Sequence, residues 1–227
     1  RHSPRVGGRI GALDARAARA VPGVVDVVAL GDRAVAVLAG DTWTAQRGAA
    51  LLGMEPVATD PVQPDSDVLQ RAYREALDGN GASIFRDDEG VPAALGSDPL
   101  TAVYELPFLA HACMEPMNCT ALFEPGSATG ERLTVWAPTQ APSIARDEAA
   151  KAAGLLPAQV EIRSTLMGGG FGRRAEMDFV VEAARAARAV PGRPVKLTWS
   201  REEDLRHDMY RPAATGPAVV FTGRTVT

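Results

Sequence analysis

Hydrophobic residues along the first part of the chain repeat with the spacing of helices and strands in turn. The predicted elements are, in chain order, a helix over 12–23, strands over 24–30 and 33–39, and a helix over 41–53. Pro22 and Gly23 stop the first helix. Asp41 is placed to cap the second helix and Gly53 to end it. We therefore predict a small α/β unit across residues 5–55.

The stretch 57–100 has a weaker pattern. One segment with helical periodicity predicts a helix at 66–78, and residues 87–100 have the composition of a loop. We interpret 57–100 as a partly ordered connector with one helix.

From residue 101 onward, strand and helix periods alternate again. The predicted elements are a strand over 131–140, a helix over 142–155, a strand over 158–167, a helix over 175–190 and a strand over 193–200. Ser143 is expected to cap the first of these helices, and residues 215–227 have the pattern of an incomplete strand. The second helix has one hydrophobic face, formed by Met177, Val180, Val181, Ala184 and Ala187. This alternation indicates an α/β or α+β protein with a buried sheet.

Length and charge limit the class of protein. The chain has 227 residues, 46% of them hydrophobic, which is enough for a sizeable core in one or two domains. A net charge of −4 gives no reason to expect nucleic acid as a partner. No apolar run reaches about 18 residues, so we expect no membrane span. The chain lacks an initiator methionine and a visible signal peptide, so we expect a fragment and leave its cellular location open.

Two cysteines, Cys113 and Cys119, lie in the segment HACMEPMNC. Their spacing is not that of a CxxC redox pair, and two cysteines are too few for a disulfide scaffold. We expect two reduced, half-buried thiols. A local disulfide is the alternative, and a metal site with His111 and Glu115 matches no standard zinc spacing.

The segment LMGGGFGRRAEMDF, residues 166–179, places a glycine loop between a predicted strand and a predicted helix. That position favours an anion site, because backbone N–H groups and a helix N-terminus both point at a ligand there. A tight turn that uses glycine only for its conformational freedom is the alternative. The loop ends in Arg173-Arg174 rather than Lys-Ser or Lys-Thr, and it lacks GxGxxG spacing. A nucleotide P-loop and a classical dinucleotide site are therefore not indicated.

Four motifs occur in one order along the chain: HACMEPMNC, VWAPTQAP, GGGFGRR and SREEDLRHDMYRPA. Together they resemble the large, molybdenum-cofactor-binding subunits of the xanthine oxidase and aldehyde oxidase family, in particular its isoquinoline 1-oxidoreductase branch. The resemblance covers most of residues 5–215. It implies an α+β fold with a hammerhead-like α/β domain over 1–56, the connector over 57–100, and the N-terminal part of a molybdopterin-binding domain over 101–227.

The resemblance also implies site residues. Gln140 corresponds to the family glutamine that donates a hydrogen bond to a molybdenum oxygen, and an amide suits that role because it is neutral and offers donors. From the residues alone, Gln140 would be interpreted as a surface glutamine at a strand end and Phe171 as an ordinary core residue. The loop whose backbone lies against the metal centre corresponds to Gly169, Gly170, Phe171 and Gly172, followed by Arg173. No residue of this chain is expected to ligate the metal.

Three positions bear on the substrate. Arg211 falls near a substrate-orienting arginine of purine-oxidising relatives, with local spacing that differs by about one residue. Those relatives carry a glutamate where this chain has Ala175, with Glu176 one position later. This departure argues against a xanthine-like substrate. Glu115 is interpreted as structural, in an ion pair.

The implied function is part of a molybdenum hydroxylase subunit. Such an enzyme hydroxylates an N-heteroaromatic or an aldehyde with oxygen from water, and passes electrons to iron–sulfur clusters. The implied cofactor is molybdopterin, in its cytosine dinucleotide form, with molybdenum. The clusters are expected on a small partner subunit, because this chain has no cysteine cluster for them. The family's catalytic glutamate lies beyond Thr227, so the chain alone is expected to be inactive.

Two other functions remain open at this point. A non-catalytic interaction or scaffold module would keep the fold without the chemistry. A nucleotide-binding domain would rest on the glycine loop alone.

Overall fold

The computed structural model describes residues 1–57, 65–79, 81, 83, 86, 100–127 and 130–220. The chain forms two compact units, one of residues 1–60 with 110–209 and one of residues 61–109 with 210–227. The three-part division predicted from the sequence stays a prediction.

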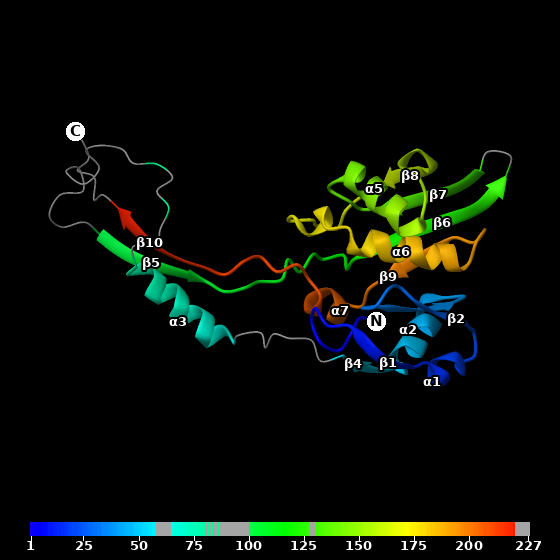
Figure 1. Cartoon of the computed structure of the whole chain (residues 1–227), viewed down its shortest axis with the longest axis horizontal. Coiled ribbons are helices and arrows are strands. Elements are labelled where there is room, and N and C mark those ends of the chain that lie inside the picture. The colour runs from blue at the N-terminus through cyan, green and yellow to red at the C-terminus, as the bar shows by residue number, and fades with distance from the viewer. Residues whose placement is uncertain are drawn as a thin grey trace. The chain divides into compact units, whose positions relative to one another are not determined.

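The N-terminal part of the first unit contains two antiparallel strand pairs and two helices (Figure 1). Its elements are β1 Ile10–Asp14, α1 Arg16–Arg19, β2 Val24–Ala29, β3 Val35–Ala39, α2 Thr42–Ala50 and β4 Gly53–Pro56. The strands predicted over 24–30 and 33–39 are confirmed as β2 and β3. The helices predicted over 12–23 and 41–53 are confirmed but shorter, because residues 12–14 belong to β1 and Gly53 begins β4, and the pair β1–β4 was not predicted. The carboxylate of Asp41 accepts a hydrogen bond from the Thr44 N–H at 2.9 Å, which confirms the predicted cap of α2.

A four-stranded mixed sheet forms the centre of the first unit, in the order β8-β7-β6-β9. Its elements are β6 Asn118–Ser127, β7 Gly130–Ala137, α5 Pro142–Ala153, β8 Val160–Ser164, α6 Asp178–Ala189, β9 Val195–Thr198 and α7 Arg201–Arg206. Strands β7 and β8 are parallel, and α5 provides the crossover between them. The predicted α+β class is confirmed.

Helices α5 and α6 pack against each other and cover one face of this sheet (Figure 1). Both helices are rich in alanine, so their backbones approach the sheet closely, and the alanines of both join one buried core. The buried face of α6 is wider than predicted. Phe179 and Ala183 are fully buried, whereas Val181 is half-buried.

The predicted cap of α5 is wrong. Ala141 occupies the N-cap position and makes no side-chain hydrogen bond, and Pro142 is the first helical residue. Proline is well suited there because its fixed φ matches the helix and its missing N–H needs no partner. Ser143 therefore lies inside the helix.

Cys113 and Cys119 are both free thiols, as predicted, and both are buried almost completely rather than half-buried. Burial raises the pKa of the Cys119 thiol to about 12. Neither thiol is available for surface chemistry.

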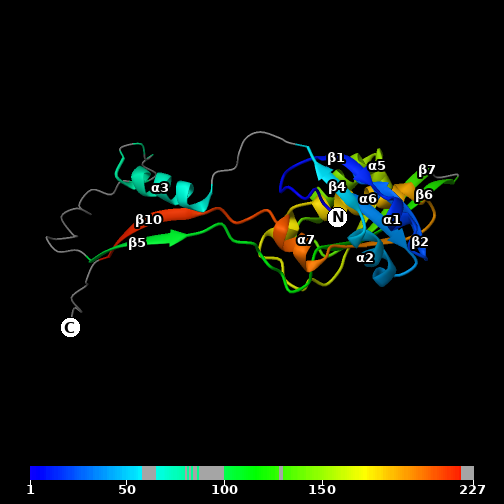
Figure 2. The same cartoon turned by 90° about the horizontal axis from the view of Figure 1, so that it is seen from below.

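The described residues of the second unit form helix α3 and one strand pair (Figure 2). Its elements are α3 Ser66–Leu77, β5 Leu100–Leu106 and β10 Ala214–Val220, with β5 and β10 antiparallel. The predicted helix is confirmed, and β10 confirms a strand within 215–227. The predicted loop over 87–100 lies outside the described residues except for Leu100, which begins β5.

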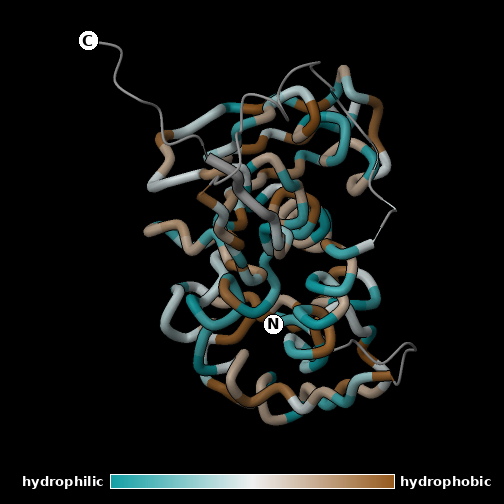
Figure 3. The backbone as a smooth tube through the Cα atoms, turned by 90° about the vertical axis from the view of Figure 1, so that its left-hand side faces the viewer, coloured by the Kyte–Doolittle hydropathy of each residue, from teal (hydrophilic) through white to brown (hydrophobic). Residues whose placement is uncertain are grey.

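Hydrophobic and hydrophilic positions alternate over short distances along the backbone (Figure 3). Among the described residues, no helix has the length and apolar character needed to cross a membrane.

Candidate functional site

The glycine loop follows β8 and runs into the short 3-10 helix η2, Arg173–Ala175, just before α6. Gly169 and Gly172 have φ values of 101° and 99°, which glycine adopts without strain. Phe171 has φ of 52°, which is rare for an aromatic residue, and its side chain is 72% exposed. The loop therefore holds a strained phenylalanine out in solvent.

Gln140 follows the end of β7 and lies against this loop. Its Oε1 accepts a hydrogen bond from the Gly172 N–H at 3.1 Å. Because a backbone N–H can only donate, this bond fixes the orientation of the amide, and its NH₂ group is left without a partner among the described residues. A Cβ on Gly170 would lie 2.8 Å from the Gln140 amide, so only glycine allows this close approach.

Three backbone N–H groups of the loop remain available. Gly168 donates to Glu115 Oε2, Gly172 to Gln140, and Arg173 to the Gly170 carbonyl. Within the described part of the chain, the N–H groups of Gly169, Gly170 and Phe171 have no such partner. Together with the Gln140 NH₂ group they make a cluster of unpaired donors, which suits anionic oxygens.

The fully buried side chain of Arg174 holds the glycine loop through hydrogen bonds. Its Nε donates to the Gly169 carbonyl at 2.8 Å, and its Nη2 donates to the Glu115 carbonyl at 2.7 Å and to Glu115 Oε2 at 2.9 Å. The predicted structural ion pair of Glu115 is confirmed. The Arg174 carbonyl accepts from the Gln140 N–H at 3.0 Å, so one residue connects the loop to the end of β7.

Glu115 is itself saturated with donors. Its carboxylate accepts from the Gly168 N–H and from Asn118 Nδ2, both at 2.9 Å. Burial alone would raise the pKa of Glu115, but these hydrogen bonds and the nearby guanidinium outweigh it and lower the pKa. Glu115 is therefore ionised at neutral pH and braces the loop.

Arg173 points into the interior, where its side chain is 1% exposed. It makes two hydrogen bonds to the Asp178 carboxylate, at 3.0 and 2.8 Å. Its Nε lies 2.8 Å from Asp208 Oδ1 but is not aligned for a hydrogen bond. The guanidinium is thus held between these two carboxylates, and its predicted cofactor contact stays a prediction.

The remaining predicted site residue, Arg211, belongs to the second unit, where its backbone pairs with that of Leu109. The structure thus brings together Gln140 and residues 169–173, and it places Arg211 in the other unit.

A second polar cluster was not predicted from the sequence. The Nδ1 of His2 lies 2.7 Å from Glu203 Oε2, and its Nε2 lies 2.7 Å from Glu182 Oε1, both at hydrogen-bond distance. Burial lowers the pKa of His2, but the two carboxylates outweigh it and raise the pKa to about 9. His2 is therefore an imidazolium between two carboxylates. No spacing signal could have revealed it, because its members are far apart in the sequence.

His207 lies beside this cluster, with its ring centroid 4.6 Å from that of His2. Burial and the charge of His2 lower the pKa of His207 to about 4. One ligand atom from each of His2, Glu203 and His207 lies within 4.8 Å of the others, close enough for a metal ion. The pairing of both His2 nitrogens with carboxylates makes this an ion-pair cluster as it stands.

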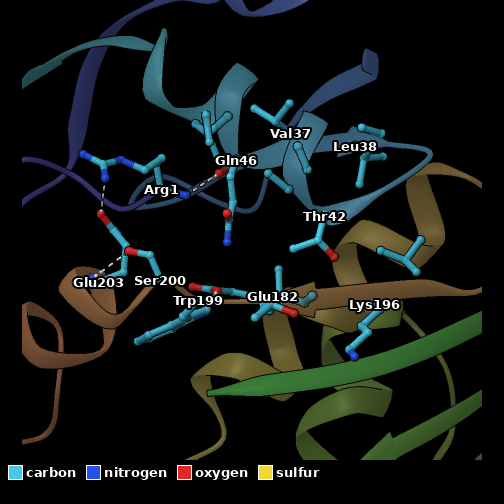
Figure 4. Close-up of a pocket in the computed structure, with 18 of the residues that line it drawn as sticks. Arg1, Val37, Leu38, Thr42, Gln46, Glu182, Lys196, Trp199, Ser200 and Glu203 are labelled. Carbon is cyan, nitrogen blue, oxygen red and sulfur yellow. Dashed lines mark hydrogen bonds and ion pairs between the residues drawn. The ribbon is translucent and has the colours of Figure 1, made fainter. Parts of the chain in front are cut away.

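A cavity of about 810 Å³ lies elsewhere in the first unit, between the β3–α2 region and β9 (Figure 4). Its lining includes Val37, Leu38, Lys196 and Trp199, and it does not include Gln140 or the glycine loop. The cavity and the donor cluster are therefore separate features.

Residues 85–218 match the family described as "Molybdopterin cofactor-binding domain". The chain is 32% identical over 214 residues to isoquinoline 1-oxidoreductase subunit beta of Brevundimonas diminuta, with 88% of this chain and 26% of that protein covered. It is 30% identical over 217 residues to "Membrane-bound aldehyde dehydrogenase [pyrroloquinoline-quinone]" of Gluconacetobacter polyoxogenes, with 91% of this chain and 27% of that protein covered.

A solved structure shares the fold. Quinoline 2-oxidoreductase from Pseudomonas putida 86 superposes with a TM-score of 0.63 at 22% identity, over 90% of this chain and 31% of that one. The chain thus spans about a quarter of the curated relatives it matches.

Proposed function

Because the chain belongs to the molybdopterin cofactor-binding domain family, we propose that it is part of the molybdenum-binding subunit of a xanthine oxidase family hydroxylase. The proposed substrate is an N-heteroaromatic compound or an aldehyde, with water as the source of oxygen. Electrons would pass to iron–sulfur clusters on a small partner subunit. The 227-residue chain alone would be inactive.

One observation carries this proposal: the cluster of unpaired donors formed by Gln140 and the N–H groups of Gly169, Gly170 and Phe171. A molybdenum cofactor presents anionic and oxo-type oxygens, so it fits a surface that offers unpaired donors, and the nearby Glu115 carboxylate is already paired with Arg174. Glycine also removes the side chains that would keep such a group away from the backbone. When bound, the cofactor would supply the two-electron redox chemistry.

The chain's own residues would position the cofactor and shield it from water. The Gln140 NH₂ group would donate to an oxygen of the cofactor, with its direction set by Gly172. The loop N–H groups would stabilise negative charge at the centre without reorganising. Phe171 would cover the centre and limit water, which explains why an exposed, strained aromatic residue stands there.

Three finer assignments are also proposals. The cofactor would be the cytosine dinucleotide form, Arg173 would contribute to its binding, and Arg211 would help to orient the substrate. The domain limits proposed for this chain are 1–56 for the hammerhead-like domain, 57–100 for the connector, and 101–227 for the N-terminal part of the molybdopterin-binding domain.

The test is Gln140→Ala in the full-length protein, with turnover and molybdenum content measured on the same sample. We expect turnover to fall by about 10²-fold or more, as for loss of one preorganised donor, with molybdenum content unchanged. Gln70→Ala, on α3 in the second unit, is the matched control and should leave turnover unchanged. Normal turnover with normal molybdenum would reject the role of Gln140.

Absence of molybdenum from the full-length complex would reject the function itself. The scaffold module would then be the better description of the chain.

A further inference from the structure

The first three residues begin a strand beside β3. The Arg1 nitrogen donates to the Val35 carbonyl at 2.8 Å, and the Val35 N–H donates back to the Arg1 carbonyl at 2.8 Å. The Ser3 N–H donates to the Arg33 carbonyl at 2.8 Å, and His2 forms an antiparallel bridge with Ala34. This strand lies on the side of β3 opposite to β2.

Beyond this point the edge of β3 is open. Backbone groups of a strand point alternately to its two sides. Since Val35 bonds to Arg1, the N–H and C=O of Val37 point to the same side, while those of Ala36 point toward β2. In the described part of the chain, the N–H and C=O of Val37 have no hydrogen-bond partner.

Strand β9 presents a second open edge. It pairs with β6 on one side only, and the Trp199 N–H donates to the Met117 carbonyl on that side at 2.9 Å. By the same alternation, the backbone groups of Lys196 and Thr198 point away from β6. They too lack partners among the residues that the structure describes.

Both open edges border the cavity of about 810 Å³ (Figure 4). Arg1 also lines this cavity, so the strand begun by residues 1–3 points into it. The walls include apolar side chains such as Val37 and Leu38. Unpaired backbone groups beside apolar side chains are costly, and a strand laid in the cavity would satisfy them.

We propose that this cavity is a strand-acceptor groove, filled by extended polypeptide that runs into Arg1 in the full-length protein. The strand would lie antiparallel to β3, in the register that the Arg1–Val35 and Ser3–Arg33 pairs already set. In that register Val37 pairs with the second residue before Arg1, and Leu38 faces the third. The strand joins the β2–β3 hairpin to the central sheet through β9.

Continuity with residues 1–3 favours this occupant over a strand from elsewhere. A separate chain would have to enter a groove whose end is already occupied by residues 1–3. The inference shares with the proposed function the need for a longer chain, but it does not need a cofactor, so the two can fail separately.

The first experiment is residue-resolved hydrogen exchange on the full-length protein. We expect the amides of Val37 and Thr198 to exchange within about 10-fold of the Ala36 amide, which already bonds to β2 and is the internal control. An open groove would instead let the Val37 and Thr198 amides exchange at least 100-fold faster than that of Ala36. That result would overturn the proposal.

The second experiment tests the register and the identity of the strand. Leu38→Cys is combined with cysteine at the third residue before Arg1, and the control places the second cysteine one residue later, where it faces the opposite side. We expect an intramolecular cross-link only in the first variant. Equal cross-linking in both, no cross-linking, or links between molecules that increase with concentration would overturn it. Links between molecules would identify a second copy as the occupant.

Discussion

Nη2 of Arg174 lies 2.9 Å from Oε2 of Glu115, and this ion pair connects two segments that are far apart in the sequence. The same guanidinium reaches carbonyl oxygens of Gly169 and Pro138, so a fully buried charge sits directly under the loop of unpaired donors. Buried cations are tolerated only where every donor is matched. The Arg174–Glu115 ion pair therefore holds the unpaired N–H donors of the glycine loop in place.

Arg174→Met should lower the free energy of unfolding of the full-length protein by roughly 2–4 kcal/mol, because it leaves buried carbonyl groups without donors. Arg174→Lys should recover only part of this loss, since an ammonium group cannot bond all the same oxygens. Urea denaturation would measure both.

Arg146→Ala provides the matched control. Arg146 pairs with Asp147 on the surface, and both side chains are about half exposed, so we expect a change below about 0.5 kcal/mol. Equal effects of Arg174→Met and Arg146→Ala would contradict the bracing role of Arg174.

Gly170→Ala should lower turnover of the full-length protein by about 10-fold or more, because the new methyl group would lie 2.8 Å from the Gln140 amide and displace it. Gly216→Ala, on β10 of the second unit, is the control, since a Cβ there meets nothing within 4 Å and φ is ordinary. Assays at saturating substrate would compare the two. Similar turnover in both variants would show that Gln140 need not lie where the structure places it.

The sequence predicted most helices and strands of the first unit, because their hydrophobic periods are regular and their ends carry Pro, Gly or Asp. It could not predict that Arg173 faces inward. An arginine beside a glycine loop suggests an anion site, whereas in the structure the Arg173 guanidinium bonds to Asp178, five residues later, and lies 2.8 Å from Asp208. The approach of Asp208, far along the chain, leaves no local pattern in the sequence.

The same limit applies to the rest of the site. Gln140 and the loop came from a resemblance between motifs, whereas the donor count came from the structure. The pairing of His2 with Glu182 and Glu203 was not visible at all, since an isolated histidine near the start of a chain carries no periodic signal.

Stability should depend on pH through His2. Its pKa is raised from 6.5 to about 9 in the folded chain, so its contribution is complete below pH 6.5 and disappears as the pH rises through 9. The shift corresponds to about 3 kcal/mol at most. His2→Gln should flatten the alkaline limb of a plot of unfolding free energy against pH. An unchanged limb would mean that His2 is not charged in the folded state.

His207 should act in the opposite direction. Its pKa is lowered to about 4, so the unfolded chain binds more protons between pH 4 and 6.5, and stability should rise with pH across that window. The two histidines together place the maximum near pH 6.5. His207→Gln should flatten only the acid limb, as measured by urea denaturation at a series of pH values. Loss of the alkaline limb in this variant would contradict the assignment.

Phe171 should show a conflict between stability and activity. Its φ of 52° costs about 1–2 kcal/mol for a residue with a Cβ, whereas glycine there would lose about 0.5–1 kcal/mol through its more flexible unfolded chain. Phe171→Gly should therefore stabilise the full-length protein by roughly 0–1.5 kcal/mol, while Phe171→Ala, which keeps the strain, should not. Both should lower turnover, because both uncover the donors to water. Parallel thermal unfolding and turnover measurements would separate the effects. Stabilisation by alanine as great as by glycine would show that the backbone at Phe171 is not strained, and full turnover in either variant would remove its shielding role.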